Sequence, residues 1–179
     1  MRILVTAASK RGSTFEIAEA IAAGLGRRGL HAEVRRPAAV RDLDGYDAVV
    51  LGSAVYHGRW CDAARSFAER LVEPLAELPT WLFSSGPLGS TDIKPDGDPI
   101  DAAPMLELTG AESHRVFTGK LDIAGLSFGE KAVVRALHAP VGDFRDWGAI
   151  DAYAREIAMR LARRQAPTPP NSSSFPSVR

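Results

Sequence analysis

A short segment near the N-terminus combines hydroxyl, basic and glycine residues in the manner of a phosphate-binding loop. Gly12 would let the backbone approach a ligand closely, and the neighbouring hydroxyl groups would donate hydrogen bonds to an anion. The segment has neither the Gly-Lys-Ser/Thr ending of nucleoside-triphosphate loops nor the Gly-x-Gly-x-x-Gly of dinucleotide loops. It predicts a site for another phosphate-bearing ligand, formed by Ser9, Lys10, Arg11, Gly12, Ser13 and Thr14. Alternatively, Ser13 or Thr14 only caps a helix and Gly12 only forms a turn.

Two later segments follow predicted strands and combine hydroxyl, aromatic and small residues with glycine. The second segment consists of Ser53, Ala54, Val55, Tyr56, His57 and Gly58, and the third consists of Ser84, Ser85, Gly86, Pro87, Leu88 and Gly89. Tyr56 is the best candidate for contact with a planar ring. His57 is expected to be a contact or a solvated side chain rather than a catalytic base. Trp60 is expected to anchor its helix in the core, because tryptophan is usually buried.

The elements that must position these segments alternate between strands and helices. Apolar runs predict strands at residues 2–7, 31–35, 46–51, 79–83 and 114–117. Apolar residues at helical spacing predict helices at residues 14–25, 60–75 and 147–162. The alternation predicts an α/β fold, namely a three-layer, doubly wound, five-stranded parallel sheet. Ligands of such sheets bind beyond the carboxyl ends of the strands, which is where the three segments are expected.

Composition excludes several classes of protein. The 179 residues carry 22 Lys and Arg against 22 Asp and Glu, with a sequence pI near 6.9, so no nucleic-acid binding is expected. No apolar run is long enough to cross a membrane, and the N-terminus lacks a secretory pattern, so we expect a cytoplasmic protein. The single cysteine, Cys61, is expected to pack a helix, and no metal-ligand spacing is found. We expect one domain over residues 1–164 and a disordered Pro- and Ser-rich tail over residues 165–179.

Two stretches interrupt the alternation of strands and helices. Residues 84–99 form a long Gly- and Pro-rich loop, for which a function is expected, and its acidic end up to Asp101 is expected to be solvated. Residues 119–146 form an insertion with a predicted helix near residues 128–137. That helix carries apolar residues beside Lys131 and Arg135, so it could pack on the core or face a hydrophobic acceptor or anionic lipid. Core packing is the preferred alternative.

The first segment resembles the flavodoxin phosphate loop, Ser/Thr-x-x-Gly-x-Thr, at Ser9, Gly12 and Thr14. Residues 52–60 and the closing residues 143–147 resemble most closely the menaquinone-dependent protoporphyrinogen oxidases of the flavodoxin-like group. The resemblance implies a flavodoxin-like fold with strand order 2-1-3-4-5. It also implies FMN as cofactor, with its phosphate on the first segment and its ring between the second and third.

The resemblance further implies an FMN-dependent oxidoreductase that passes electrons from an organic reductant, protoporphyrinogen-like for example, to a quinone-type acceptor. The alternative is a flavodoxin-like electron carrier whose partner is a redox protein. A flavin-free scaffold like that of response regulators lacks support, because Leu51-Gly52-Ser53 replaces their phosphoacceptor aspartate. Beyond the small-molecule or quinone partner we expect at most peripheral membrane contact, at the inner face, and a homodimer stays open.

Overall fold

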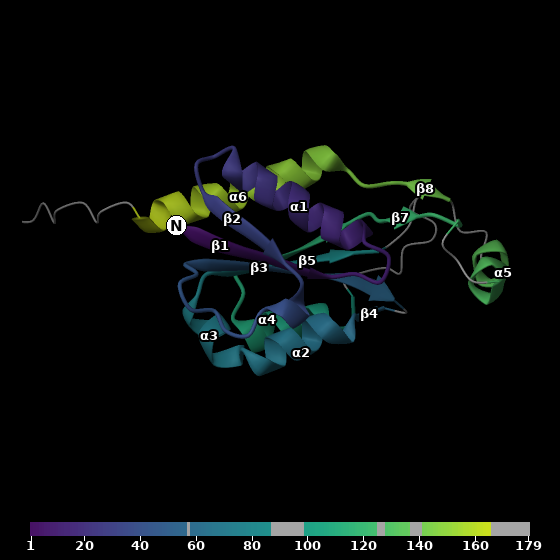
Figure 1. The fold of residues 1–179 in the computed structure, drawn as a ribbon, viewed down its shortest axis with the longest axis horizontal. Coiled ribbons are helices and arrows are strands. Elements are labelled where there is room, and N and C mark those ends of the chain that lie inside the picture. Colours follow the sequence, from purple (N-terminus) through teal and green to yellow (C-terminus); the bar gives the residue numbers. More distant parts are fainter. Residues whose placement is uncertain (57, 87–98, 125–127, 137–140, 166–179) are drawn as a thin grey trace, which may run out of the picture.

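The computed structural model describes residues 1–56, 58–86, 99–124, 128–136 and 141–165. Within these residues a parallel sheet forms the centre of the molecule (Figure 1), in the order β2-β1-β3-β5-β6. Its strands are Arg2–Ala8 (β1), His31–Arg35 (β2), Ala48–Tyr56 (β3), Thr80–Ser85 (β5) and Ser113–Phe117 (β6). A short strand, Arg59–Trp60 (β4), pairs antiparallel with the end of β3. Counted along the five parallel strands, this is the predicted 2-1-3-4-5 order, so the fold prediction is confirmed.

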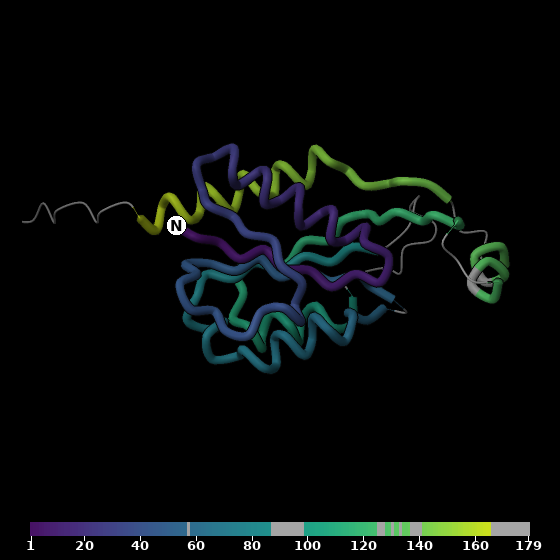
Figure 2. Tube along the Cα trace, in the orientation of Figure 1, coloured from purple at the N-terminus to yellow at the C-terminus, as the bar shows by residue number. Residues whose placement is uncertain are grey.

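Helices cover both faces of the sheet (Figure 1). Ser13–Gly26 (α1) and Trp147–Gln165 (α6) form one layer. The other layer consists of Asp62–Arg70 (α2), Val72–Glu77 (α3) and Ala102–Thr109 (α4), with the 3-10 turn Pro37–Ala39 (η1) beside them. Figure 2 shows that the chain after β6 runs past the carboxyl ends of the strands and returns as α6 alongside α1.

Successive residues of the central strands are buried on opposite faces of the sheet, which explains why these strands are apolar throughout. A hydrophobic core lies on each face of the sheet. In β1, Ile3 and Val5 pack in the first core, against α1 and α6, whereas Leu4 packs in the second core, against α2. A strand buried on both faces needs apolar side chains at every position. Because these strands are parallel, their carboxyl-terminal residues lie at the same edge of the sheet.

The strands and helices depart from the predicted bounds where pairing or proline intervenes. β3 and β5 continue to Tyr56 and Ser85, because β4 pairs with the end of β3 and β5 pairs with β3 up to that point. The helix predicted over residues 60–75 is two helices, and Pro74 explains the break. Its ring would clash with the carbonyl of Arg70, four residues earlier, where α2 ends. Helix α4 was not among the predicted elements.

The insertion has a structured base and a helix that stands apart from the core. Lys120–Leu121 (β7) pairs antiparallel with Gly142–Asp143 (β8), and Phe128–Ala136 (α5) lies beyond the sheet, separate from both helical layers (Figure 1). Phe128 is 89% exposed, and neither core contains a described residue of α5. The described side chains of this helix therefore do not pack on the core, contrary to the preferred alternative. Among the described helices, none is long and apolar enough to span a bilayer.

Candidate functional site

The first loop leads directly from β1 into α1 and has the geometry of an anion site. Gly12 adopts a left-handed conformation with φ of 87°, which favours glycine, and occupies the N-cap of α1. Its amide donates to Oγ of Ser9 at 2.9 Å, and its carbonyl accepts from the amide of Glu16 at 3.0 Å. No side chain caps the helix, so the alternative that Ser13 or Thr14 is a cap is wrong. The first amides of a helix have no intrahelical partner and favour an anion.

Thr14 carries the observation that most directly tests whether a phosphate fits. Its side chain is only 1% exposed, and its hydroxyl oxygen has no hydrogen-bond partner among the described residues. A buried hydroxyl without a partner is costly and rare in a folded protein. Placed in the first turn of α1, it is suited to donate to a ligand oxygen. The residues of this loop therefore fit a bound phosphate.

Arg145 fastens the start of α1 to the base of the insertion. Its side chain is 3% exposed. Its Nη1 donates to Oε2 of Glu16 at 2.6 Å and to the carbonyl of Ser13 at 3.2 Å. Its Nε donates to Oδ1 of Asp143 at 2.8 Å, and its guanidinium lies 4.4 Å from the centre of the Trp147 ring. Because two carboxylates balance its charge, Arg145 positions the loop rather than serving as a counter-charge for the ligand.

The pair of Asp143 and Arg145 predicts a pH dependence of stability. Hydrogen bonds from Arg145 lower the pKa of Asp143 from 3.8 to about 2. A carboxyl group whose pKa is lowered in the folded protein stabilises the folded state at pH values above its ordinary pKa. This stabilisation is lost as the pH falls towards 2. In urea unfolding from about pH 5 downwards, Asp143→Asn should lose less stability than the parent, by under about 1 kcal/mol because the carboxyl is partly exposed. Identical pH profiles for the two proteins would contradict this assignment.

The second segment lies mostly in β3 rather than in a loop. Ser53 is fully buried, and its hydroxyl donates to the carbonyl of Ala54 at 2.8 Å and accepts from the amide of Cys61 at 2.8 Å. Ala54 is buried, while Val55 and Tyr56 are half-buried. The amino group of Lys10 lies 4.4 Å from the centre of the Tyr56 ring, which joins the first and second segments. Gly58 has φ of 76° in the turn to β4, and His57 lies outside the described residues.

The third segment begins inside β5, beside the second. The Ser84 hydroxyl accepts from Nε1 of Trp60 at 2.8 Å and lies 2.7 Å from Nε2 of His114. Trp60 is 3% exposed, so its expected place in the core is confirmed. Ser85 is buried, and a Cβ on Gly86 would lie 2.9 Å from the carbonyl oxygen of Val55, so glycine permits this close approach. Pro87, Leu88 and Gly89 lie outside the described residues.

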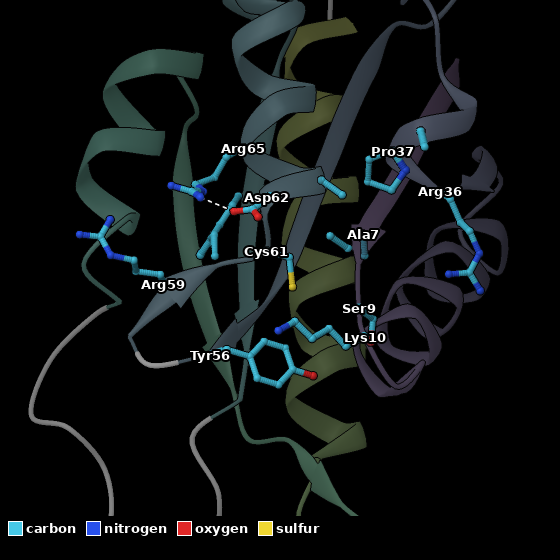
Figure 3. Close-up of a pocket in the computed structure, with 14 residues that line it drawn as sticks. Ala7, Ser9, Lys10, Arg36, Pro37, Tyr56, Arg59, Cys61, Asp62 and Arg65 are labelled. Atoms are coloured by element: carbon cyan, nitrogen blue, oxygen red, sulfur yellow. Dashed lines mark hydrogen bonds and ion pairs between the residues drawn. The ribbon is translucent and has the colours of Figure 1, made fainter. Parts of the chain in front are cut away.

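A cavity of about 570 Å³ opens beside these segments (Figure 3). It is lined by Ala7, Ala8, Ser9, Lys10, Arg36, Pro37, Ala38, Tyr56, Arg59, Trp60, Cys61, Asp62, Ala63 and Arg65. Asp101 supports one wall: its carboxylate accepts from the amide of Trp60 at 2.8 Å and lies 3.4 Å from Arg59. Asp101 is 7% exposed, so it does not belong to a solvated acidic loop as expected. Cys61 is half-buried against the second core, and this burial raises its pKa.

The sequence matches one known family along most of its length. The family is described as a flavodoxin domain, and the match covers residues 4–146. The chain belongs to the flavodoxin-domain family. The matched residues include all three segments and extend from β1 to the residue before α6. FMN is the cofactor of this family, so the predicted cofactor is confirmed.

Solved structures show the same fold. A flavodoxin from the domain Archaea matches with a TM-score of 0.63 and 18% identity, over 90% of this chain and 99% of the other. Oxidised flavodoxin 1 from Bacillus cereus matches with a TM-score of 0.61 and 16% identity, over 90% and 99%. Rubredoxin oxygen:oxidoreductase from Desulfovibrio gigas matches with a TM-score of 0.63 and 14% identity, over 93% of this chain but 37% of the other. No curated protein matches the sequence.

Sequence reasoning missed the residues whose partners lie far away along the chain. Glu16 and Arg145 meet across 129 positions, and the segment Arg36–Ala38 reaches the cavity from the end of β2. The only available signal was an arginine between two aspartates just before α6. Within the described residues, no cluster of metal-binding side chains occurs.

Proposed function

We propose that this flavodoxin-domain protein is an FMN-dependent oxidoreductase that passes electrons from an organic reductant, such as a protoporphyrinogen-like compound, through FMN to a quinone-type acceptor. The observation that carries the proposal is the cavity of about 570 Å³ beside the first and second segments. Small-molecule sites are concave and of this size, whereas exchange of electrons between proteins needs only an accessible flavin edge. The resemblance of residues 52–60 and 143–147 to the protoporphyrinogen oxidases supports the same conclusion.

In this proposal each segment has a separate task towards FMN, which supplies the redox chemistry when bound. The first segment would hold the phosphate through helix amides, the Thr14 hydroxyl and the positive charges of Lys10 and Arg11. Backbone groups of the second and third segments would border the ring. The hydroxyls of Ser53 and Ser84 would contribute indirectly, by holding the ends of β3 and β5 in place, because both residues are fully buried and already hydrogen-bonded.

The test of the proposed function is turnover without a protein partner. The FMN-loaded protein would be mixed anaerobically with protoporphyrinogen, reduced nicotinamides or other organic reductants, and flavin bleaching followed by stopped-flow absorption. A quinone is then added to the reduced protein. Reduction by an organic compound and reoxidation by the quinone alone would support the proposal. Reoxidation only after a redox protein is added would overturn it in favour of an electron carrier.

The electron carrier is retained as a second candidate because of one observation. The archaeal flavodoxin aligns over 99% of its own length, so the chain contains a complete flavodoxin-like fold. This likeness concerns the fold alone. For either function we propose a cytoplasmic location with at most peripheral membrane contact, for which the exposed Phe128 beside Lys131 on α5 provides a surface.

Tyr56 provides a test of the ring position. The amino group of Lys10 lies 4.4 Å from the centre of the Tyr56 ring and Tyr56 borders the cavity, so we propose that this ring contacts the isoalloxazine. Tyr56→Ala should weaken flavin binding roughly fivefold and shift the bound flavin's absorption, since an aromatic contact contributes about 1 kcal/mol. Tyr56→Phe, the matched control, should keep both. FMN and riboflavin should be affected alike, and an unchanged spectrum in Tyr56→Ala would place the ring elsewhere.

A further inference from the structure

The cavity adjoins the expected flavin position without coinciding with it. The flavin segments lie at the carboxyl ends of β1, β3 and β5, whereas the cavity is lined by residues at the carboxyl ends of β2, β1 and β3 and by the start of α2 (Figure 3). Among the described residues, the lining includes neither Ser84, Ser85 and Gly86 of the third segment nor Gly12, Ser13 and Thr14 of the first. The two sites meet at Ser9, Lys10 and Tyr56. A molecule in the cavity would therefore lie against one side of the flavin site.

The lining combines an apolar floor with a strongly cationic rim. Small apolar side chains and Trp60 form the floor, from Ala7, Ala8, Pro37, Ala38 and Ala63. Among the described residues, the rim carries four cationic side chains, Lys10, Arg36, Arg59 and Arg65, and one carboxylate, Asp62, which binds Arg65. Asp101 lies behind Arg59, so the part of the rim that the structure describes keeps an excess of two positive charges even when Asp101 is counted. Such a rim attracts anions and disfavours cationic molecules.

Arg36 and Arg59 lie at opposite ends of the cavity, and their guanidinium groups extend outward from it (Figure 3), so each would turn inward to bind an acidic group. The Arg36 guanidinium lies 4.7 Å from the centre of the Phe15 ring, and Arg59 is directed by Asp101. Planar guanidinium groups bind carboxylates or sulfonates and stack on aromatic rings, so they suit an aromatic acid. The apolar floor would cover the body of the molecule while the rim neutralises its charge.

We propose that this cavity binds the electron acceptor and that the acceptor is an aromatic molecule with an acidic group. The proposal rests on the proposed function for the direction of electron flow, whereas binding in the cavity can be measured without turnover. It narrows the quinone-type acceptor to acidic members of that class and disfavours neutral, lipid-like ones. Lys10 and Tyr56, which border both sites, would lie between the acceptor and the flavin.

Cys61 makes the proposal testable because it is the single cysteine of the chain and lines the cavity. Its labelling by monobromobimane would be followed in the FMN-loaded protein, at mildly alkaline pH because burial raises the pKa of the thiol. Anthraquinone-2-sulfonate is the acidic probe and 2-(hydroxymethyl)anthraquinone the neutral control. At ten times its Kd, the acidic probe should slow labelling about tenfold by mass action, and the neutral one far less at the same concentration.

Charge variants test whether the acidic probe binds in the cavity or elsewhere on the surface. Arg36→Gln combined with Arg59→Gln should weaken the acidic probe about tenfold, as expected for two partly exposed ion pairs. Arg163→Gln, on the exposed last turn of α6, removes a cation elsewhere and should change nothing. Calorimetric titration of the probe gives an independent Kd for each variant.

Three results would overturn the proposal: no protection by anthraquinone-2-sulfonate, equal protection by the neutral compound, or complete shielding of Cys61 by FMN alone. The last would assign the cavity to the flavin itself. Protection without any quinone turnover would leave the binding site supported and overturn the proposed function. Turnover of the acidic quinone without protection of Cys61 would leave the proposed function supported and overturn this site.

Discussion

Thr14→Ala should weaken FMN binding about tenfold or more while leaving riboflavin binding nearly unchanged, because hydrogen bonds to charged groups contribute about 1.5–3 kcal/mol. The Thr14 hydroxyl is buried at the start of α1 and has no partner among the described residues, so the ligand phosphate is its expected acceptor. Riboflavin lacks the phosphate and cannot use this bond. Titration of apoprotein with each flavin, followed by fluorescence quenching, gives the two dissociation constants.

Two controls distinguish this effect from a general loss of stability. Thr14→Ser keeps the hydroxyl and should retain most of the preference for FMN over riboflavin. Thr109→Ala removes another buried threonine, whose hydroxyl donates to the carbonyl of Met105 at 2.7 Å in α4, away from the first loop. It should lower stability without changing the ratio of the two affinities. Unchanged FMN affinity in the Ser9→Ala/Thr14→Ala double variant would disprove the phosphate assignment.

Arg145→Met should lower the free energy of unfolding by about 2 kcal/mol, less than the 3–5 kcal/mol typical of fully buried pairs. The reduction follows from its partners: the side chains of Glu16 and Asp143 are 48% and 39% exposed and regain water when the guanidinium is removed. The variant should also bind FMN more weakly relative to riboflavin, because the Ser13 carbonyl loses its donor and the first turn of α1 loosens. Urea unfolding and paired flavin titrations measure the two effects.

Arg28→Met is the matched control for Arg145. Arg28 follows α1 and binds Asp151 of α6 at 2.9 Å, so it is a second arginine that ties down α1, at the end of the helix opposite to the first loop. Its loss should lower stability but leave the FMN to riboflavin ratio unchanged. Arg145→Lys keeps the charge without the planar fork and should recover only part of both properties. If Arg28→Met and Arg145→Met shifted the ratio equally, Arg145 would have no special role in positioning the loop.

The amino-acid sequence by itself determined the fold class and the position of the loop to which we assign the FMN phosphate. Strands such as residues 2–7 and 46–51 are apolar at successive positions because both faces of the sheet are covered, and burial of this kind is recorded locally in residue type. The signal for this loop is also local in sequence. Ser9, Gly12 and Thr14 lie within a few residues of one another, so their spacing already indicates the turn and the start of α1.

Only the tertiary structure decided which polar groups are available to a ligand and where the cavity lies. Both Ser53 and Thr14 were predicted from the sequence to be ligand contacts. The Ser53 hydroxyl is already hydrogen-bonded to the backbone of Ala54 and Cys61, whereas the Thr14 hydroxyl has no partner among the described residues. Arg145 reaches Glu16 across 129 positions, and Arg36 joins the cavity because β2 ends beside β1. Such contacts depend on strand order, register and helix packing, which periodicity along the chain does not specify.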